Sequence, residues 1–77
     1  MAVADKIKAF LKIKGKDTAA LAEHLHISKQ ALSNKYYRDS FSAEDLIKIA
    51  DFLKCDLAFI DNMDRVNFDL CDIKDGE

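Results

Sequence analysis

A short polar stretch, residues 29–34, holds the side chains whose types and spacing best suit a chemical task. At about 100° per residue, Gln30, Ser33 and Asn34 would share one side of a helix, with Lys29 at its edge. The amides of Gln and Asn can bond N6 and N7 of adenine together, and a lysine can donate to N7 and O6 of guanine. The pattern therefore indicates a surface that reads base edges, although any exposed helix face is also polar. Lys29 is equally placed to contact a phosphate.

The segment around this stretch must position it. Asp17 is a good N-cap for a helix over Thr18–Leu25, and Ser28 is a good N-cap for a second helix from Lys29 to about Tyr37. Two short helices joined by so short a turn must cross steeply, and one of them then projects from the domain. A projecting helix of this kind fits the major groove of DNA.

The rest of the chain predicts two more helices and a change of period. Helical spacing favours a helix over about Ala2–Lys14, followed by Gly15 in a left-handed position. Ser42 with Asp45 resembles a capping box and opens a helix over Ala43–Leu53.

Beyond Lys54 the apolar residues alternate with polar ones. Val66, Phe68 and Leu70 predict a strand with one buried face. Residues 56–60 suit either a fifth helical turn or a first strand, and residues 61–64 have turn chemistry. We favour a β-hairpin.

The chain has 77 residues, no proline and two glycines, which predicts one domain without a flexible linker. Its two cysteines are too few and too far apart for a disulfide framework, so free thiols are expected. No apolar run reaches the roughly 20 residues of a membrane span, and the N-terminus lacks a signal-peptide pattern. We therefore expect a cytoplasmic protein.

The net charge of −2 is unevenly distributed. Residues 1–38 hold eight Lys or Arg against three Asp or Glu, a balance of +5. Residues 39–77 hold four against eleven, a balance of −7. A basic half could meet phosphate while the acidic half is repelled, or both halves could simply be solvated faces.

Several positions in this order resemble the lambda-repressor/Cro-like (XRE-type) helix-turn-helix family. The matching residues are Leu21-Ala22, Leu25, Ile27-Ser28, Leu32-Ser33 and Leu46-Ile47-Lys48-Ile49-Ala50. The resemblance implies a mainly α, compact four-to-five-helix DNA-binding domain, here with a C-terminal β-strand or β-hairpin. It also implies a transcriptional regulator, commonly a repressor, which binds a palindromic operator in double-stranded DNA as a homodimer. By resemblance, Lys29, Gln30, Ser33 and Asn34 fall where family members read bases.

Phosphate contacts need positive charge, hydroxyls or free amides near the ends of the motif. We expect them from Lys16, Thr18, Lys35, Tyr37, Arg38 and Ser40. Three features depart from the family pattern. His26 stands where the family favours glycine in the turn, Lys35 replaces a commonly apolar residue, and the loop over residues 37–41 is slightly short.

We expect residues 1–54 to form the helix-turn-helix domain, and residues 55–72 to add a strand or hairpin packed on it. Residues 73–77 would be a frayed acidic tail. An exposed strand edge over Val66 to Leu70 could pair with its copy and form a dimer, or these residues could only cover the helical core.

No enzyme, cofactor or metal site is expected. His24 and His26 would point in different directions across a helix end, the cysteines form no CxxC pair, and no glycine-rich phosphate loop is present. No small-molecule ligand domain fits in this length. The alternative function is a protein-interaction module, antitoxin-like or anti-repressor, which keeps the fold without reading DNA and binds a basic partner through its acidic half.

Overall fold

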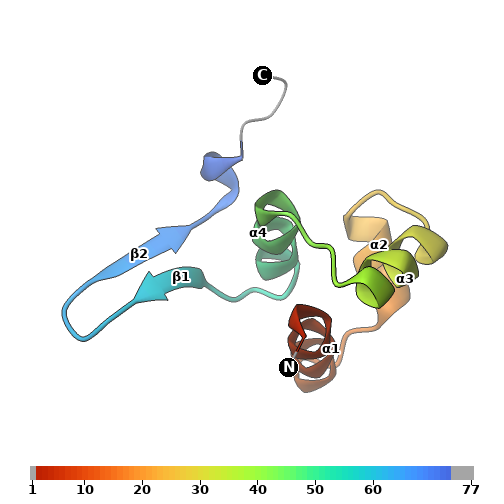
Figure 1. Cartoon of the computed structure of the whole chain (residues 1–77), viewed down its shortest axis with the longest axis horizontal. Coiled ribbons are helices and arrows are strands. Elements are labelled where there is room, and N and C mark those ends of the chain that lie inside the picture. The colour runs from red at the N-terminus through yellow and green to blue at the C-terminus, as the bar shows by residue number, and fades with distance from the viewer. Residues whose placement is uncertain (1, 74–77) are drawn as a thin grey trace.

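The computed structural model describes residues 2–73 and places four helices beside a two-stranded antiparallel sheet (Figure 1). This confirms the expected class, a mainly helical helix-turn-helix domain with a C-terminal hairpin. The elements, in chain order, are α1 (Val3–Ile13), α2 (Thr18–His24), α3 (Lys29–Arg38), α4 (Ala43–Phe52), β1 (Leu57–Ile60), β2 (Arg65–Phe68) and the 3₁₀ turn η1 (Leu70–Asp72). No helix within the described residues is long and apolar enough to cross a membrane.

Side chains satisfy the free amides at the starts of the later helices. Asp17 accepts a hydrogen bond from the Ala20 amide at 2.8 Å, and Ser28 accepts one from the Ala31 amide at 3.0 Å. At the start of α4, the predicted capping box over Ser42 and Asp45 is present in both directions. The predicted helix ends agree with the observed ones to within one residue.

Each helix is followed by a residue with left-handed backbone. Gly15 has φ +68°, His26 has φ +59°, Asp39 has φ +54° and Lys54 has φ +57°. Only the first is glycine, so three side chains occupy a conformation that costs about 1–2 kcal/mol for an ordinary residue. His26 thus adopts the backbone that glycine favours at this turn position, and the turn keeps its shape at an energetic cost.

Asp39 has a second task, which the sequence pattern did not reveal. Ala2 provides no side-chain cap for α1. The carboxylate of Asp39 instead accepts hydrogen bonds from the amides of Ala4 at 2.7 Å and Val3 at 3.3 Å. The residue that ends α3 therefore caps α1, and this contact fixes the C-terminal end of α3 against the first helix.

The core lies between the four helices. Leu21 of α2 and Leu32 of α3 are fully buried, and Ala22 is small where these two helices approach. Leu25 is buried and Ile27 is half-buried against the same cluster, so the residues on both sides of the turn between α2 and α3 contribute to the core. The buried cluster is completed by Ile7, Leu11, Ile49 and Leu53.

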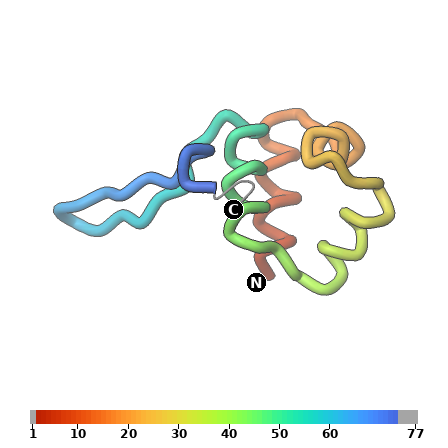
Figure 2. Tube along the Cα trace, turned by 90° about the horizontal axis from the view of Figure 1, so that it is seen from above, coloured from red at the N-terminus to blue at the C-terminus, as the bar shows by residue number. Residues whose placement is uncertain are grey.

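The C-terminal hairpin confirms the first-strand interpretation of residues 56–60. Leu57 faces Phe68 at the base of the hairpin, and Ile60 faces Arg65 near its tip. The hairpin extends away from the helical body, with its base beside α4 (Figures 1 and 2).

Two details of the predicted strand are wrong. The strand ends at Phe68 because the carboxylate of Asp69 accepts a hydrogen bond from the Cys71 amide at 3.0 Å and starts η1, which contains Leu70. Val66 is 60% exposed rather than part of a buried face, since the hairpin reaches beyond the helices. Of the predicted acidic tail, residues 74–77 lie outside the described residues.

Candidate nucleic-acid interface

One face of α3 packs inward and the opposite face is exposed. Leu32 is fully buried and Tyr36 is half-buried, whereas Gln30, Ser33 and Asn34 are exposed. This is the division that helical periodicity predicts. The helix lies at the opposite end of the molecule from the hairpin (Figure 1).

Two of the proposed base-reading side chains are coupled to each other. Nε2 of Gln30 donates a hydrogen bond to Oδ1 of Asn34 at 3.3 Å, one helical turn away. The bond leaves each amide with free donors and acceptors, and it restricts the orientations that the two side chains sample. A pre-oriented amide pair loses less entropy when it binds a base edge.

Lys29 and Ser33 complete the exposed face. Both are exposed, and Lys29 stands in the first turn of α3, directly after the Ser28 cap. Within the described residues, the Lys29 ammonium makes no ion pair. Its charge is therefore available to a guanine or a phosphate.

At the other end of α3, three of the expected phosphate contacts are exposed. Tyr37 is 91% exposed, which is unusual for a tyrosine without a binding role, and Arg38 and Ser40 are exposed beside it. Among the described residues the Arg38 guanidinium has no ion-pair partner. Each of the three side chains carries a hydrogen-bonding group that is exposed near the end of α3.

The two expected contacts near the start of α2 have neighbours within the protein. The Lys16 ammonium lies 5.7 Å from the centre of the Phe52 ring, an arrangement that attracts a cation. Thr18 is half-buried and its hydroxyl faces that of Tyr36, although the two do not meet the geometry of a hydrogen bond. Both remain close to the surface, but their side chains are less free than those at the end of α3.

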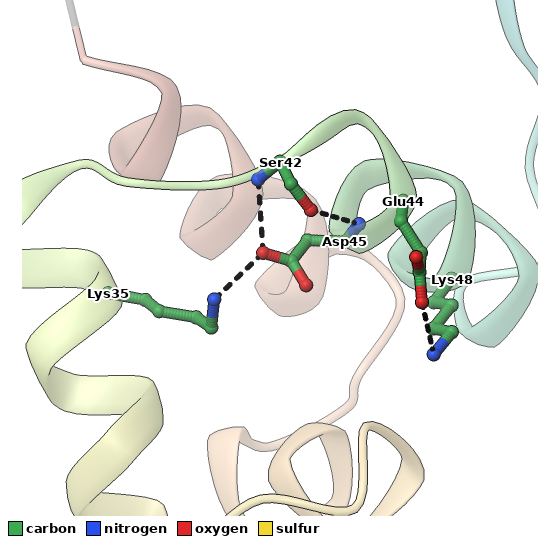
Figure 3. Close-up of polar contacts among 5 residues, drawn as sticks. All are labelled: Lys35, Ser42, Glu44, Asp45 and Lys48. Atoms are coloured by element: carbon green, nitrogen blue, oxygen red, sulfur yellow. Dashed lines mark hydrogen bonds and ion pairs between the residues drawn. The ribbon is translucent and has the colours of Figure 1, made fainter. Parts of the chain in front are cut away.

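Lys35 differs from the expectation of a phosphate contact. Its ammonium lies 2.8 Å from Oδ2 of Asp45, and the two side chains are only 29% and 19% exposed (Figure 3). The same carboxylate accepts a hydrogen bond from the Ser42 amide at 3.0 Å. The long stem of Lys35 extends from α3 toward the start of α4, so its charge reaches the carboxylate of Asp45 (Figure 3). In this arrangement the Lys35 ammonium is less available to a phosphate than the exposed Arg38 guanidinium is.

The pKa of Asp45 reflects this environment. Burial by itself raises the pKa, but hydrogen bonds from Lys35 and Ser42 and the positive charge of Lys35 outweigh it. The pKa of Asp45 is consequently held below its ordinary value, and the carboxylate stays charged well into the acidic range. The ion pair joins α3 to α4, and a second pair, Glu44 with Lys48 at 3.0 Å, lies on α4 (Figure 3).

Tyr36 holds the inner side of α3. Its ring lies 5.8 Å from that of Phe41, and the ammonium of Lys8 on α1 lies 4.8 Å from the ring centre. Burial raises the pKa of its hydroxyl, and the interaction with Thr18 offsets part of that effect. Tyr36 thus takes over the packing that the family places one residue earlier, at the position of Lys35.

Sequence reasoning missed Asp39 and the partner of Lys35. Asp39 lies 35 residues from Ala4, so neither local spacing nor propensity could connect them. Asp45 was recognised as part of a capping box, and that role occupies only part of its carboxylate. The charged Lys35 at a commonly apolar position was the one sequence signal that pointed to a partly buried partner, which the structure identifies as Asp45.

A protein-family model, described as the bacteriophage CI repressor helix-turn-helix domain, matches residues 2–61. The matched region contains all four helices and β1. No curated protein and no solved structure matches the chain.

Proposed function

Because the chain belongs to the bacteriophage CI repressor helix-turn-helix family, a family of DNA-binding regulators, we propose that it is a sequence-specific transcriptional repressor. In this proposal α3 enters the major groove of double-stranded DNA. Bound across a promoter, such a domain would block access of the transcription machinery to that DNA.

The exposed face of α3 carries the proposal. Gln30 and Asn34 present amides that can bond N6 and N7 of adenine, and their mutual hydrogen bond holds them on one side of the helix. Lys29 would donate to guanine from the first turn, and Ser33 would bond either kind of base edge. Each good base contact contributes about 1–3 kcal/mol of discrimination against a wrong base pair.

Phosphate contacts would fix the register of the helix in the groove. We assign the main ones to Tyr37, Arg38 and Ser40, which are exposed together at the end of α3. Lys16 and Thr18 would contact the backbone from the start of α2. The acidic half of the chain would face away from DNA, which favours one orientation of the domain.

A homodimer on a palindromic operator fits this mode of reading. One copy of α3 spans only a few base pairs, and a second copy about 34 Å away would read the same sequence one helical turn along. Two weak half-sites then act together, which raises the affinity for the full operator far above that for one half.

Selection of bound sequences from random DNA, followed by gel shifts on the selected site, tests the proposal. Gln30→Ala with Asn34→Ala should lower affinity for the selected site by roughly tenfold to a thousandfold and leave non-specific binding intact. Asn67→Ala, which removes an exposed asparagine of β2 at the opposite end of the molecule from α3, is the matched control and should leave the affinity for the selected site unchanged.

Two outcomes would count against the proposal. If no DNA is bound even at low salt, the domain does not act on DNA, and a role in protein interaction becomes the better hypothesis. If the double variant keeps the sequence preference of the wild type, α3 does not read bases through Gln30 and Asn34.

A further inference from the structure

The hairpin carries an unusual share of the exposed apolar surface. Among residues 2–73, five of the eight large hydrophobic side chains that are exposed lie in residues 57–70. Met63 at the turn is 89% exposed, and Phe59 and Val66 are 72% and 60% exposed. Single exposed apolar residues are normal, but a cluster on one projecting element commonly marks an interaction surface.

The shape of the hairpin agrees with this. It has two strands of four residues each, and it extends beyond the helices with only its base against α4 (Figure 2). An isolated two-stranded hairpin is at best marginally stable in water. Covering the half of the hairpin nearest its turn would therefore stabilise the protein more than covering an ordinary surface loop would.

One apolar face of the hairpin is continuous with a hollow on the helical body. Leu57 and Phe59 share this face with Val66 and Phe68, since residues two apart lie on one side of a strand and facing residues share that side. The rings of Phe59 and Phe68 are in edge contact, with centroids 5.1 Å apart. Between this face and the first turns of α4 is an open cavity of about 230 Å³, lined by Ala43, Leu46 and Ile47 as well as the hairpin.

A second hollow, of about 270 Å³, lies between α1 and α4. Val3 and Phe10 line it on the α1 side, while Leu46 and Leu57 belong to both hollows. The two hollows therefore form one apolar groove, which runs from α1 across α4 to the hairpin. An enclosed apolar cavity of about 150 Å³ holds a benzene ring, so each hollow has room for a phenylalanine side chain.

We propose that this groove binds a second copy of the chain, and that the distal hairpin of each copy (Phe59, Met63 and Val66) packs into the groove of the other. This inference rests on the proposed homodimer and assigns its interface. The arrangement is reciprocal, so one two-fold axis satisfies both copies at once. It uses the apolar face of the hairpin, whereas the sequence pattern had suggested the strand edge.

Charge favours this occupant. The tip of the hairpin carries Asp61 and Asp64, and the hydrogen bonds that Asp61 accepts from the amides of Met63 and Asp64 lower its pKa and keep it ionised. Lys6 lines the groove, and within the described residues its ammonium has no ion-pair partner. Asp56 also lines the groove, but its carboxylate is paired with Arg65, so among the described residues Lys6 is the unpaired charge there. The acidic, apolar tip thus meets an apolar groove whose unpaired charge is positive, and both are parts of the same chain.

The position of the groove leaves the DNA-reading surface free. The hairpin and α3 lie at opposite ends of the long axis of the molecule (Figure 1). A dimer formed through the groove would keep both copies of α3 exposed, as binding to two half-sites requires.

Sedimentation equilibrium of the full chain without DNA tests the proposal. The wild type should form a dimer at protein concentrations below about 0.1 mM. Met63→Glu should raise the dimer dissociation constant by at least about tenfold, because it places a charge in an apolar interface. Met63 makes no core contact, so this variant should fold normally, as a circular dichroism spectrum would verify.

Ile13→Glu is the matched control. Ile13 is 73% exposed on α1 but does not line the groove, so its replacement should leave the dissociation constant unchanged. A monomeric wild type at about 0.1 mM would overturn the inference. So would a dimer that Met63→Glu and Ile13→Glu weaken equally, since the interface would then lie elsewhere.

A charge exchange gives a second and independent test. Lys6→Glu and Asp64→Lys should each weaken the dimer, and the double variant should recover most of the wild-type affinity because the pair is restored with opposite sign. If the double variant dimerises no better than the single variants, Lys6 of one copy does not face Asp64 of the other, and the proposed contact is wrong.

Failure of the inference can be told apart from failure of the proposed function. If the wild type is monomeric but selects a DNA sequence, the interface is wrong and the DNA-binding function stands. If it forms the predicted dimer but binds no DNA, the interface stands and the function is wrong.

Discussion

Lys35 and Arg38 test whether two basic residues of α3 have different roles, one in stability and the other in DNA binding. Both are long basic residues near the C-terminal end of the helix, three positions apart. Lys35 is held 2.8 Å from Asp45 in a partly buried ion pair, whereas Arg38 is exposed. The same substitution, to methionine, should therefore have opposite consequences for folding and for DNA binding.

Lys35→Met should destabilise the fold by about 1 kcal/mol, because a charge-assisted hydrogen bond is lost while the buried stem is kept. It should hardly change the salt dependence of DNA binding, since its charge is already neutralised. Arg38→Met should alter the free energy of unfolding by less than about 0.5 kcal/mol. It should reduce the slope of log K against log salt by about 0.9, the value of one lost phosphate contact.

Urea denaturation followed by far-ultraviolet circular dichroism measures the first pair of effects, and fluorescence anisotropy of labelled operator DNA at several salt concentrations measures the second. A double-mutant cycle of Lys35→Met with Asp45→Asn should give a coupling energy of about 1 kcal/mol. The reasoning is refuted if Lys35→Met lowers the salt slope as much as Arg38→Met does and leaves stability unchanged. Lys35 would then release Asp45 on DNA and act as the phosphate contact that the sequence suggested.

Three further predictions concern stability. Asp39→Ala should lower the free energy of unfolding by about 1–2 kcal/mol because α1 loses its cap. Asp39→Asn keeps an acceptor for the Ala4 amide and should lower it by less. Thermal unfolding would show the difference, and equal losses of stability would disprove the capping role. His26→Gly should raise the free energy of unfolding by about 0.5–1 kcal/mol through relief of the left-handed backbone, while Glu23→Gly at an exposed position within α2 should lower it by about as much. The ionised Asp45 contributes stability that is complete above the unfolded pKa of about 3.9 and is lost as pH falls through its lower folded value. Asp45→Asn should therefore flatten the fall of stability in acid, and a denaturation series from neutral pH downward that runs parallel to the wild type would contradict this assignment.

Local chemistry explains why so much of the fold could be predicted. Asp17, Ser28 and Ser42 each cap a helix that begins with the next residue, so their effect is confined to one turn of chain. The division of α3 into a buried Leu32 side and an exposed Asn34 side follows from helical period alone. These features depend on neighbours within four residues and can be read from the order of amino acids.

Most features that escaped prediction depend on distant parts of the chain, whereas the end of the strand at Asp69 depends on a local contact with Cys71. The period of two in Val66, Phe68 and Leu70 correctly indicated a strand, but not that Asp69 would end it or that the hairpin would extend past the core. A strand pattern specifies which residues share a face, and the rest of the fold decides whether that face is covered.

The sequence by itself thus determined four helices, the starting caps of the last three, the helix-turn-helix order and the residues that α3 exposes. The tertiary structure alone decided that Asp39 caps α1, that Asp45 neutralises Lys35, and that the apolar face of the hairpin lies open beside a groove. The physical reason is the separation along the chain over which each interaction acts. Capping and periodicity act through bonds and contacts a few residues apart, whereas the availability of a charge or an apolar side chain depends on what the folded chain brings next to it.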